Sequence, residues 1–98
     1  MNPSSILIWN VRCLNDAARR NSVRDVILSS NAEIVCLQET KIEHMNQRVF
    51  LSVFGSSYDK FVALPANGTR GGILIAWKSN TCQAIAARVD TFSVSVLF

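Results

Sequence analysis

The chain has 98 residues, a formal net charge of +3, and 49% hydrophobic against 17% charged residues. This length suffices for one small domain that buries roughly 60–65% of its unfolded surface, and so low a charged fraction fits a piece of something larger, or a chain with an obligate partner. The mild positive charge permits a polyanionic partner such as nucleic acid without arguing for one, because no dense run of Lys and Arg is present.

The cysteines, the N-terminal stretch and the hydropathy exclude several classes of protein. Cys13, Cys36 and Cys82 are odd in number and form no CxxC pair, so neither a disulfide framework nor a zinc site is predicted, and a reducing compartment is favoured. No basic region precedes the first apolar stretch, which ends too early for a signal peptide, and no apolar run approaches the ~20 residues of a membrane span. We therefore expect an intracellular protein, nuclear or cytoplasmic.

The first part of the chain predicts a strand, a helix and a second strand. The first strand covers Ser5–Val11, and the helix covers Ala17–Ser29, with Asn15 or Asp16 available as its N-cap. The second strand, Glu33–Gln38, is apolar on both faces and is therefore expected in the middle of a sheet that is covered on both sides.

The predicted helix Ala17–Ser29 has one apolar face and several basic residues. The apolar residues recur at helical spacing and are expected to face the core: Val23, Val26 and Ile27. The basic residues lie on other faces and are expected to be solvated: Arg19, Arg20 and Arg24.

The second half of the chain predicts one more helix and then antiparallel strands. The helix covers Glu43–Phe54, and its apolar residues fall at i, i+4 and i+8. The period then becomes alternating, so Tyr58–Leu64 and Gly72–Lys78 are predicted as a hairpin around the loop Pro65–Arg70. Another strand is predicted over Thr81–Arg88.

The last predicted strand still alternates at the final residue of the sequence. Its apolar residues share one face: Phe92, Val94, Val96 and Phe98. Natural domains seldom finish on a bare apolar strand residue, so we expect a single, incomplete α/β domain over residues 1–98. The uncovered apolar stripe and sheet edge are expected to drive self-association.

Two polar residues end the first two strands, Asn10 and Glu39. Strands joined by a crossover helix run parallel, so both residues should emerge at the same edge of the sheet. In open α/β sheets, ligands bind at that edge. A carboxylate beside a carboxamide there is the beginning of a site for a divalent metal and a phosphate, though not a whole one.

Three runs of the sequence, in their order and spacing, resemble the endonuclease/exonuclease/phosphatase superfamily. They are ILIWNVRCLN (Ile6–Asn15), IVCLQETK (Ile34–Lys41) and GTRGGILIAWKS (Gly68–Ser79). Within this superfamily, they most resemble the endonuclease domain of plant non-LTR retrotransposons. The likeness covers nearly all of this chain but only the N-terminal part of the family's domain. It implies a partial, DNase I-like two-sheet α/β sandwich, with a β-α-β unit followed by antiparallel strands.

The resemblance also implies chemistry, namely hydrolysis of phosphodiester or phosphomonoester bonds with Mg²⁺, or with Mn²⁺ in its place. Glu39 matches the family's metal-binding glutamate, and Asn10 matches the asparagine beside the metal and the scissile phosphate. Mg²⁺ prefers hard oxygen ligands, commonly one or two carboxylates with water and substrate phosphate. The implied partner of the complete family member is DNA, and Arg70 is a candidate contact to its phosphates from the hairpin tip.

The sequence departs from the family pattern in two ways. Cys13 stands where relatives usually have Gly, and a Cβ there would tilt the first loop. The family's later Asp-Asn pair, and the Asp-His pair that activates the attacking water, have no counterpart before Phe98. The single histidine, His44, is expected as a solvent-facing residue in the first turn of the second helix. The 98 residues are therefore expected to bind metal weakly and to be inactive or nearly so alone.

Structural interpretations of the same residues stay open. Glu39 taken alone is an ordinary loop carboxylate, Asn10 a strand-end residue that bonds its own backbone, and Arg70 a solvated turn residue. Trp9 and Trp77 lie inside strand patterns and are expected in the core. Cys36 is expected in the core as well. Two rival functions remain: a non-catalytic remnant or interaction module, and a phosphatase branch of the same superfamily acting on an inositol phosphate or on RNA.

Overall fold

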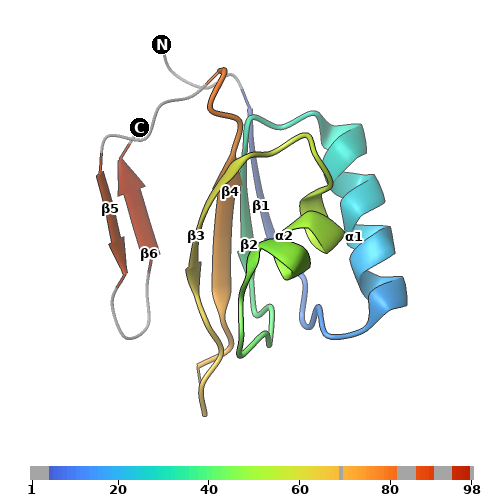
Figure 1. The fold of residues 1–98 in the computed structure, drawn as a ribbon, viewed down its shortest axis with the longest axis vertical. Coiled ribbons are helices and arrows are strands. Elements are labelled where there is room, and N and C mark those ends of the chain that lie inside the picture. The colour runs from blue at the N-terminus through green and yellow to red at the C-terminus, as the bar shows by residue number, and fades with distance from the viewer. Residues whose placement is uncertain (1–4, 69, 82–85, 90–93, 98) are drawn as a thin grey trace.

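The computed structural model describes residues 5–68, 70–81, 86–89 and 94–97. In chain order, its helices and strands are β1 (Ile6–Asn10), α1 (Ala17–Ser30), β2 (Ile34–Gln38), α2 (Gln47–Phe54), β3 (Lys60–Leu64), β4 (Ile73–Trp77), β5 (Ala86–Val89) and β6 (Val94–Leu97). Figure 1 shows these elements as an α/β arrangement, which confirms the predicted fold class.

A four-stranded mixed sheet with the strand order β1-β2-β4-β3 forms the centre of the fold. β1 and β2 are parallel, as the strand–helix–strand pattern predicted, and their register pairs Asn10 with Gln38. β4 runs antiparallel to both of its neighbours, β2 and β3. β2 therefore lies inside the sheet, and this position agrees with its two apolar faces.

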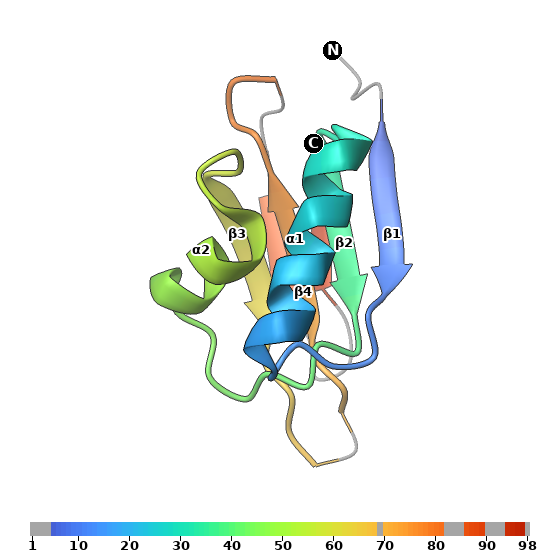
Figure 2. The same cartoon turned by 90° about the vertical axis from the view of Figure 1, so that its right-hand side faces the viewer.

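Both helices cover one face of this sheet, and the paired strands β5 and β6 lie next to β3 on the other side (Figure 1 and Figure 2). The main core fills the space between the helices and the sheet. Phe50 of α2 stacks on Phe54 with ring centroids 5.0 Å apart, and on Phe61 of β3 at 4.4 Å. These rings tie α2 to the sheet, because aromatic pairs at such distances add to the energy of burial alone.

Helix α1 begins and ends at side chains that satisfy its free backbone groups. The N-cap is Asp16, whose carboxylate accepts from the Ala18 N–H at 3.1 Å, and the helix ends at Asn31 in the left-handed conformation. Val23 and Ile27 are fully buried as predicted, whereas Val26 is 46% exposed. The prediction for Val26 was wrong because a position one residue from Ile27 points about 100° away from it around the helix axis.

Helix α2 is shorter than predicted, and the segment from Glu43 to Met45 precedes it. Asn46 has an extended backbone and accepts from the Val49 N–H at 2.9 Å, so it acts as the N-cap and the helix begins at Gln47. The prediction that His44 lies in the first helical turn was therefore wrong, although His44 is exposed as expected. The apolar spacing alone could not locate this cap.

The predicted solvated arginine face is also wrong in part. Arg20 and Arg24 are half-buried between the two helices. Arg20 Nε donates to the Leu14 carbonyl at 2.5 Å, and Arg24 Nη1 donates to the Ser52 carbonyl at 3.2 Å. A guanidinium group can satisfy carbonyls at such a helix–helix contact while its aliphatic stem packs against apolar neighbours. Arg19 remains exposed and lies over the Trp9 ring.

The β3–β4 hairpin forms as predicted, with strands somewhat shorter than expected. Its loop is closed by reciprocal backbone hydrogen bonds between Asn67 and Arg70, at 3.0 and 2.9 Å. At the other end of the hairpin, Asp59 accepts from both the side chain and the backbone N–H of Ser79. These two hydrogen bonds lower the pKa of the Asp59 carboxyl from its ordinary value.

Several sequence predictions concern residues at the edge of what the structure describes. The antiparallel pairing of β5 with β6 agrees with the two strands predicted near the end of the chain. The apolar stripe proposed on Phe92, Val94, Val96 and Phe98 lies outside the described residues and side chains.

Trp77 is 6% exposed and Trp9 packs against the main core, as expected of core residues. Cys36 is half-buried, and this burial raises the pKa of its thiol. Neither described helix is long and apolar enough to cross a membrane.

Candidate active site

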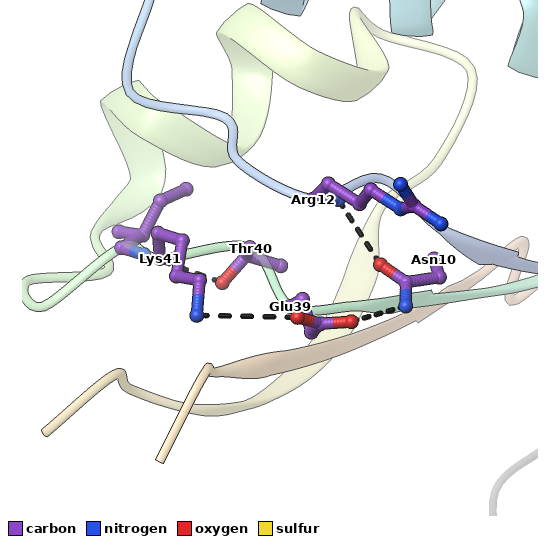
Figure 3. A network of polar contacts seen from close by, with 6 residues as sticks. Asn10, Arg12, Glu39, Thr40 and Lys41 are labelled. Atoms are coloured by element: carbon purple, nitrogen blue, oxygen red, sulfur yellow. Dashed lines mark hydrogen bonds and ion pairs between the residues drawn. The ribbon is translucent and has the colours of Figure 1, made fainter. Parts of the chain in front are cut away.

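The carboxyl edge of the parallel strand pair brings Asn10 and Glu39 together. Asn10 is the last residue of β1, Glu39 follows β2 directly, and Asn10 Nδ2 donates to Glu39 Oε2. The Asn10 Oδ1 atom accepts from the Arg12 N–H at 3.2 Å (Figure 3). The Asn10 carboxamide therefore makes two contacts at the same time. Its oxygen accepts from the nearby Arg12 backbone, as in an ordinary strand-end residue, and its nitrogen donates to the Glu39 carboxylate.

The backbone of the loop after β2 turns the Glu39 side chain toward solvent. Glu39 and Lys41 both have left-handed backbones, with φ of 53° and 60°, and Thr40 between them is only 2% exposed. The Thr40 N–H donates to the Gly72 carbonyl at 3.2 Å, and the Lys41 N–H donates to the Gly71 carbonyl at 2.7 Å. These bonds hold the loop against the start of β4 and leave the carboxylate outside.

The pair Gly71-Gly72 permits this close approach. A Cβ on Gly71 would lie 3.2 Å from Glu39 Cγ and 3.3 Å from its Cα. A Cβ on Gly72 would lie 2.5 Å from Thr40 Oγ1, and Gly72 has a φ of 90° that side chains rarely adopt. The sequence analysis missed both positions as site residues, although two adjacent glycines at the start of a strand are a signal of close backbone approach.

An open pocket of about 320 Å³ lies at this edge. It is lined by Asn10, Gln38, Glu39, Arg70, Gly71, Gly72 and Ile73. The structure thus brings the three candidate residues of the sequence analysis into one pocket. Arg70 is half-buried, and its Nε donates to the Pro65 carbonyl at 2.8 Å, so it is held within the hairpin loop.

The charges at this pocket are largely exposed to solvent. Lys41 Nζ lies 4.0 Å from Glu39 Oε1, and both side chains are 47% exposed. Such an ion pair contributes little to stability because water screens it. His44 lies in a different pocket, and the described part of the chain contains no cluster of three or more His, Cys, Asp or Glu side chains that could enclose a metal ion.

Residues 7–94 match the sequence profile of the Endonuclease/Exonuclease/phosphatase family. The chain belongs to this family. Among solved structures, the crystal structure of the AP endonuclease LMAP from Leishmania major superposes with a TM-score of 0.61 and 27% sequence identity, over 81% of this chain and 25% of that chain. The chain therefore spans about a quarter of the length of that relative. No curated protein matches it.

The departure from the family pattern at Cys13 has a structural consequence. Arg12 and Cys13 have φ values of 61° and 148°, in the region that favours glycine. The loop cannot easily relax, because the Val11 N–H donates to the Gln38 carbonyl at 3.1 Å and the Leu14 N–H to the Thr40 carbonyl at 2.8 Å. Cys13 therefore holds a strained backbone between two fixed points.

Replacing Cys13 with Gly should stabilise the protein. Removing the Cβ relieves a strain of about 1–3 kcal/mol and costs roughly 0.5–1 kcal/mol of extra chain entropy, so a net gain of about 1 kcal/mol is expected. Urea unfolding of Cys13→Gly and of Cys13→Ala would measure it. The Ala variant also lacks the thiol but keeps the Cβ, so it should show no gain. Equal effects of the two variants would contradict the strain argument.

Replacing Gly72 with Ala should destabilise the protein strongly. The added Cβ meets the buried Thr40 and needs a positive φ, and together these effects cost about 2–5 kcal/mol. Gly68 is the matched control, because it has a φ of 59° but no atom within 4 Å of an added Cβ, and Gly68→Ala should cost only about 1–2 kcal/mol. Thermal melts compare the two variants, and similar losses would show that the contact with Thr40 is unimportant.

Proposed function

We propose that this chain forms the first part of a divalent-metal-dependent phosphodiesterase domain that cuts DNA, of the type found in plant non-LTR retrotransposons. The observation that supports it is the contact between Asn10 Nδ2 and Glu39 Oε2 in a pocket that Arg70 also lines. A carboxylate, a carboxamide and a guanidinium meet there at the carboxyl edge of β1 and β2, where α/β proteins bind ligands.

The donor set at this edge fits a hard divalent cation that keeps most of its water. Glu39 supplies one half-exposed carboxylate, and among the described residues it is the only carboxylate that lines the pocket. Mg²⁺ is commonly bound through one or two carboxylates, with waters and substrate phosphate completing the shell, and Mn²⁺ accepts the same ligands. Binding to these residues alone is therefore weak. When bound, the metal would polarise the phosphate and offset charge on the leaving oxygen.

The other residues of the pocket act on the substrate phosphate directly. Asn10 is neutral, so it can hold the Glu39 carboxylate and donate toward a phosphate oxygen without adding charge that repels the substrate. The Arg12 N–H donates to the Asn10 carboxamide and so fixes its orientation. Arg70 adds positive charge at the rim of the same pocket, and a guanidinium matches phosphate oxygens through paired N–H donors.

The described residues do not supply a general base at this pocket. His44 lies on the far side of the loop after β2, in the second pocket, and the residues that line the first pocket include one carboxylate and no imidazole. A water cannot be deprotonated efficiently there without such a group. We propose that the attacking water is activated by residues of the family's later motifs, and that these 98 residues are nearly inactive alone.

The purified chain should not nick supercoiled plasmid in Mg²⁺ above the level of its Glu39→Gln variant. Joined to the remaining part of the domain from the Leishmania major AP endonuclease, it should nick supercoiled or abasic-site DNA, and EDTA should abolish the activity. In that fusion, Glu39→Gln should lower the rate by roughly 10²–10³-fold.

The matched control in this assay is Asp25→Asn, which neutralises an exposed carboxylate on α1 and should leave the rate unchanged. Nicking by the unfused chain that depends on Glu39 would overturn the proposed inactivity. A fusion that folds but cuts DNA equally well with Glu39→Gln would overturn the proposed function itself.

We also propose that the isolated chain self-associates through the outer face of β1. β1 is the edge strand of the four-stranded sheet, and Ile6 and Ile8 on it are 57% and 67% exposed. An exposed apolar edge strand readily pairs with other chains.

Size-exclusion chromatography with light scattering at several concentrations should therefore show an apparent mass above the monomer for the wild-type chain. Ile8→Lys should shift the chain toward monomer, whereas Val26→Lys should not, because Val26 is an exposed apolar residue on α1 instead. A monodisperse wild-type monomer would contradict this proposal.

A further inference from the structure

A second open pocket of about 290 Å³ lies on the other side of the loop after β2, between that loop and the two helices. Its polar lining comes from Asn15, Arg20, Lys41, Glu43 and His44. Two of these side chains are cationic, Arg20 and Lys41, and one is a carboxylate, Glu43. The function proposed above uses neither this pocket nor Arg20.

Arg20 is fixed in place before any ligand binds. Its side chain is half-buried, its Nε donates to the Leu14 carbonyl at 2.5 Å, and its Nη1 lies 3.5 Å from Ser52 Oγ. A guanidinium has five N–H donors in a rigid fork, so these two contacts leave donors for a ligand in the pocket. Because the group is already held, little side-chain entropy is lost when it binds an anion.

The loop that carries Lys41 is fixed as well. Asn15 Nδ2 donates to the Lys41 carbonyl at 2.8 Å, and the Ala66 N–H donates to the Ile42 carbonyl at 2.7 Å. The Lys41 ammonium itself lies toward the first pocket, 4.0 Å from Glu39 Oε1 and 3.5 Å from where a Cβ on Gly71 would be. The fixed cation of the second pocket is therefore Arg20.

We propose that this pocket binds a phosphate group. The half-buried Arg20 guanidinium and the second N–H of the Asn15 carboxamide offer the forked and single donors that suit the oxygens of phosphate. A metal ion is excluded as the main ligand, since Glu43 is the one carboxylate among the lining residues and hard cations need several oxygens. Glu43 is exposed, so its opposing charge is screened by water.

The phosphate could be free in solution or belong to the backbone of a nucleic acid. The second source rests on the proposed function and deepens it. Lys41 contacts Glu39 and also lines this pocket, so the two sites adjoin, and the pocket is a neighbouring contact for the backbone of a strand bound at Glu39. Such a contact would anchor and orient the strand without reading its sequence.

The test uses the 98-residue chain labelled with ¹⁵N, in EDTA, titrated with inorganic phosphate against sodium chloride of equal ionic strength. Phosphate should shift the signals of Arg20 Nε and of the backbone amides from Lys41 to His44, with saturation. His44→Glu places a carboxylate in the pocket at an exposed position and should weaken binding by roughly tenfold or more.

The matched control is Gln47→Glu, three residues along the chain. Gln47 is exposed and does not line the pocket, and the substitution adds one carboxylate, as His44→Glu does. It should leave phosphate binding unchanged. Absence of shifts at the pocket, or an equal loss in both variants, would overturn the proposal, because the effect would then be absent or due to overall charge.

A second titration uses a fluorescein-labelled octathymidylate, also in EDTA. Weaker binding of this oligonucleotide to His44→Glu but not to Gln47→Glu supports a backbone phosphodiester as the ligand, whereas a selective effect on inorganic phosphate alone supports free phosphate. Neither titration requires cleavage. Glu39→Gln should retain the phosphate shift at Arg20 Nε while strongly lowering the rate of nicking by the fusion, so failure of the proposed function and failure of this site give different results.

Discussion

The parallel pairing of β1 with β2, extended past both strand ends by backbone hydrogen bonds, is the constraint on which the rest of the structure depends. The Val11 N–H reaches the Gln38 carbonyl, and the Leu14 N–H reaches the Thr40 carbonyl. The loops after the two strands are therefore joined as well as the strands. A slip of one residue in this register would turn the side chains of one strand to the opposite face, and Asn10 would no longer meet Glu39.

The loop after β2 separates two pockets and contributes to both of them. Successive side chains of this loop are exposed, buried and exposed: the Glu39 carboxylate, the Thr40 hydroxyl and the Lys41 ammonium. Left-handed φ values at the two charged residues make this alternation possible. Non-glycine residues held in that region cost free energy, which the surrounding hydrogen bonds must offset. The packing against Gly71 and Gly72 is therefore part of the site, because it holds the loop in a conformation that it would not keep alone.

The arginines of α1 show how one residue type serves two purposes in a small domain. Arg24 donates to the Ser52 carbonyl, which joins α1 to α2, and also to the Asn21 side chain on its own helix. Arg20 donates to the Leu14 carbonyl before α1 and also lines the second pocket. Charge counting alone cannot separate these roles, since a modest net charge of +3 says nothing about where each cation lies.

The sequence by itself determined the order and type of the elements, because hydrophobic periodicity is a local property. The short apolar runs around Ile8 and Ile75, the helical spacing of Val23 and Ile27, and the double-sided apolar strand Glu33–Gln38 each indicate one secondary structure. The meeting of Asn10 with Glu39 also followed, since a crossover helix makes consecutive strands parallel.

Only the tertiary structure decided the features that depend on contacts between distant segments. The position of the loop after β2 against the hairpin loop depends on the bond from the Ala66 N–H to the Ile42 carbonyl. The burial of Arg20 depends on α1 packing against α2, and the need for glycine at position 72 depends on a hydroxyl that lies 32 residues earlier in the chain. Local pattern records what a segment prefers, whereas these features are set by which groups the fold brings within a few ångströms of one another.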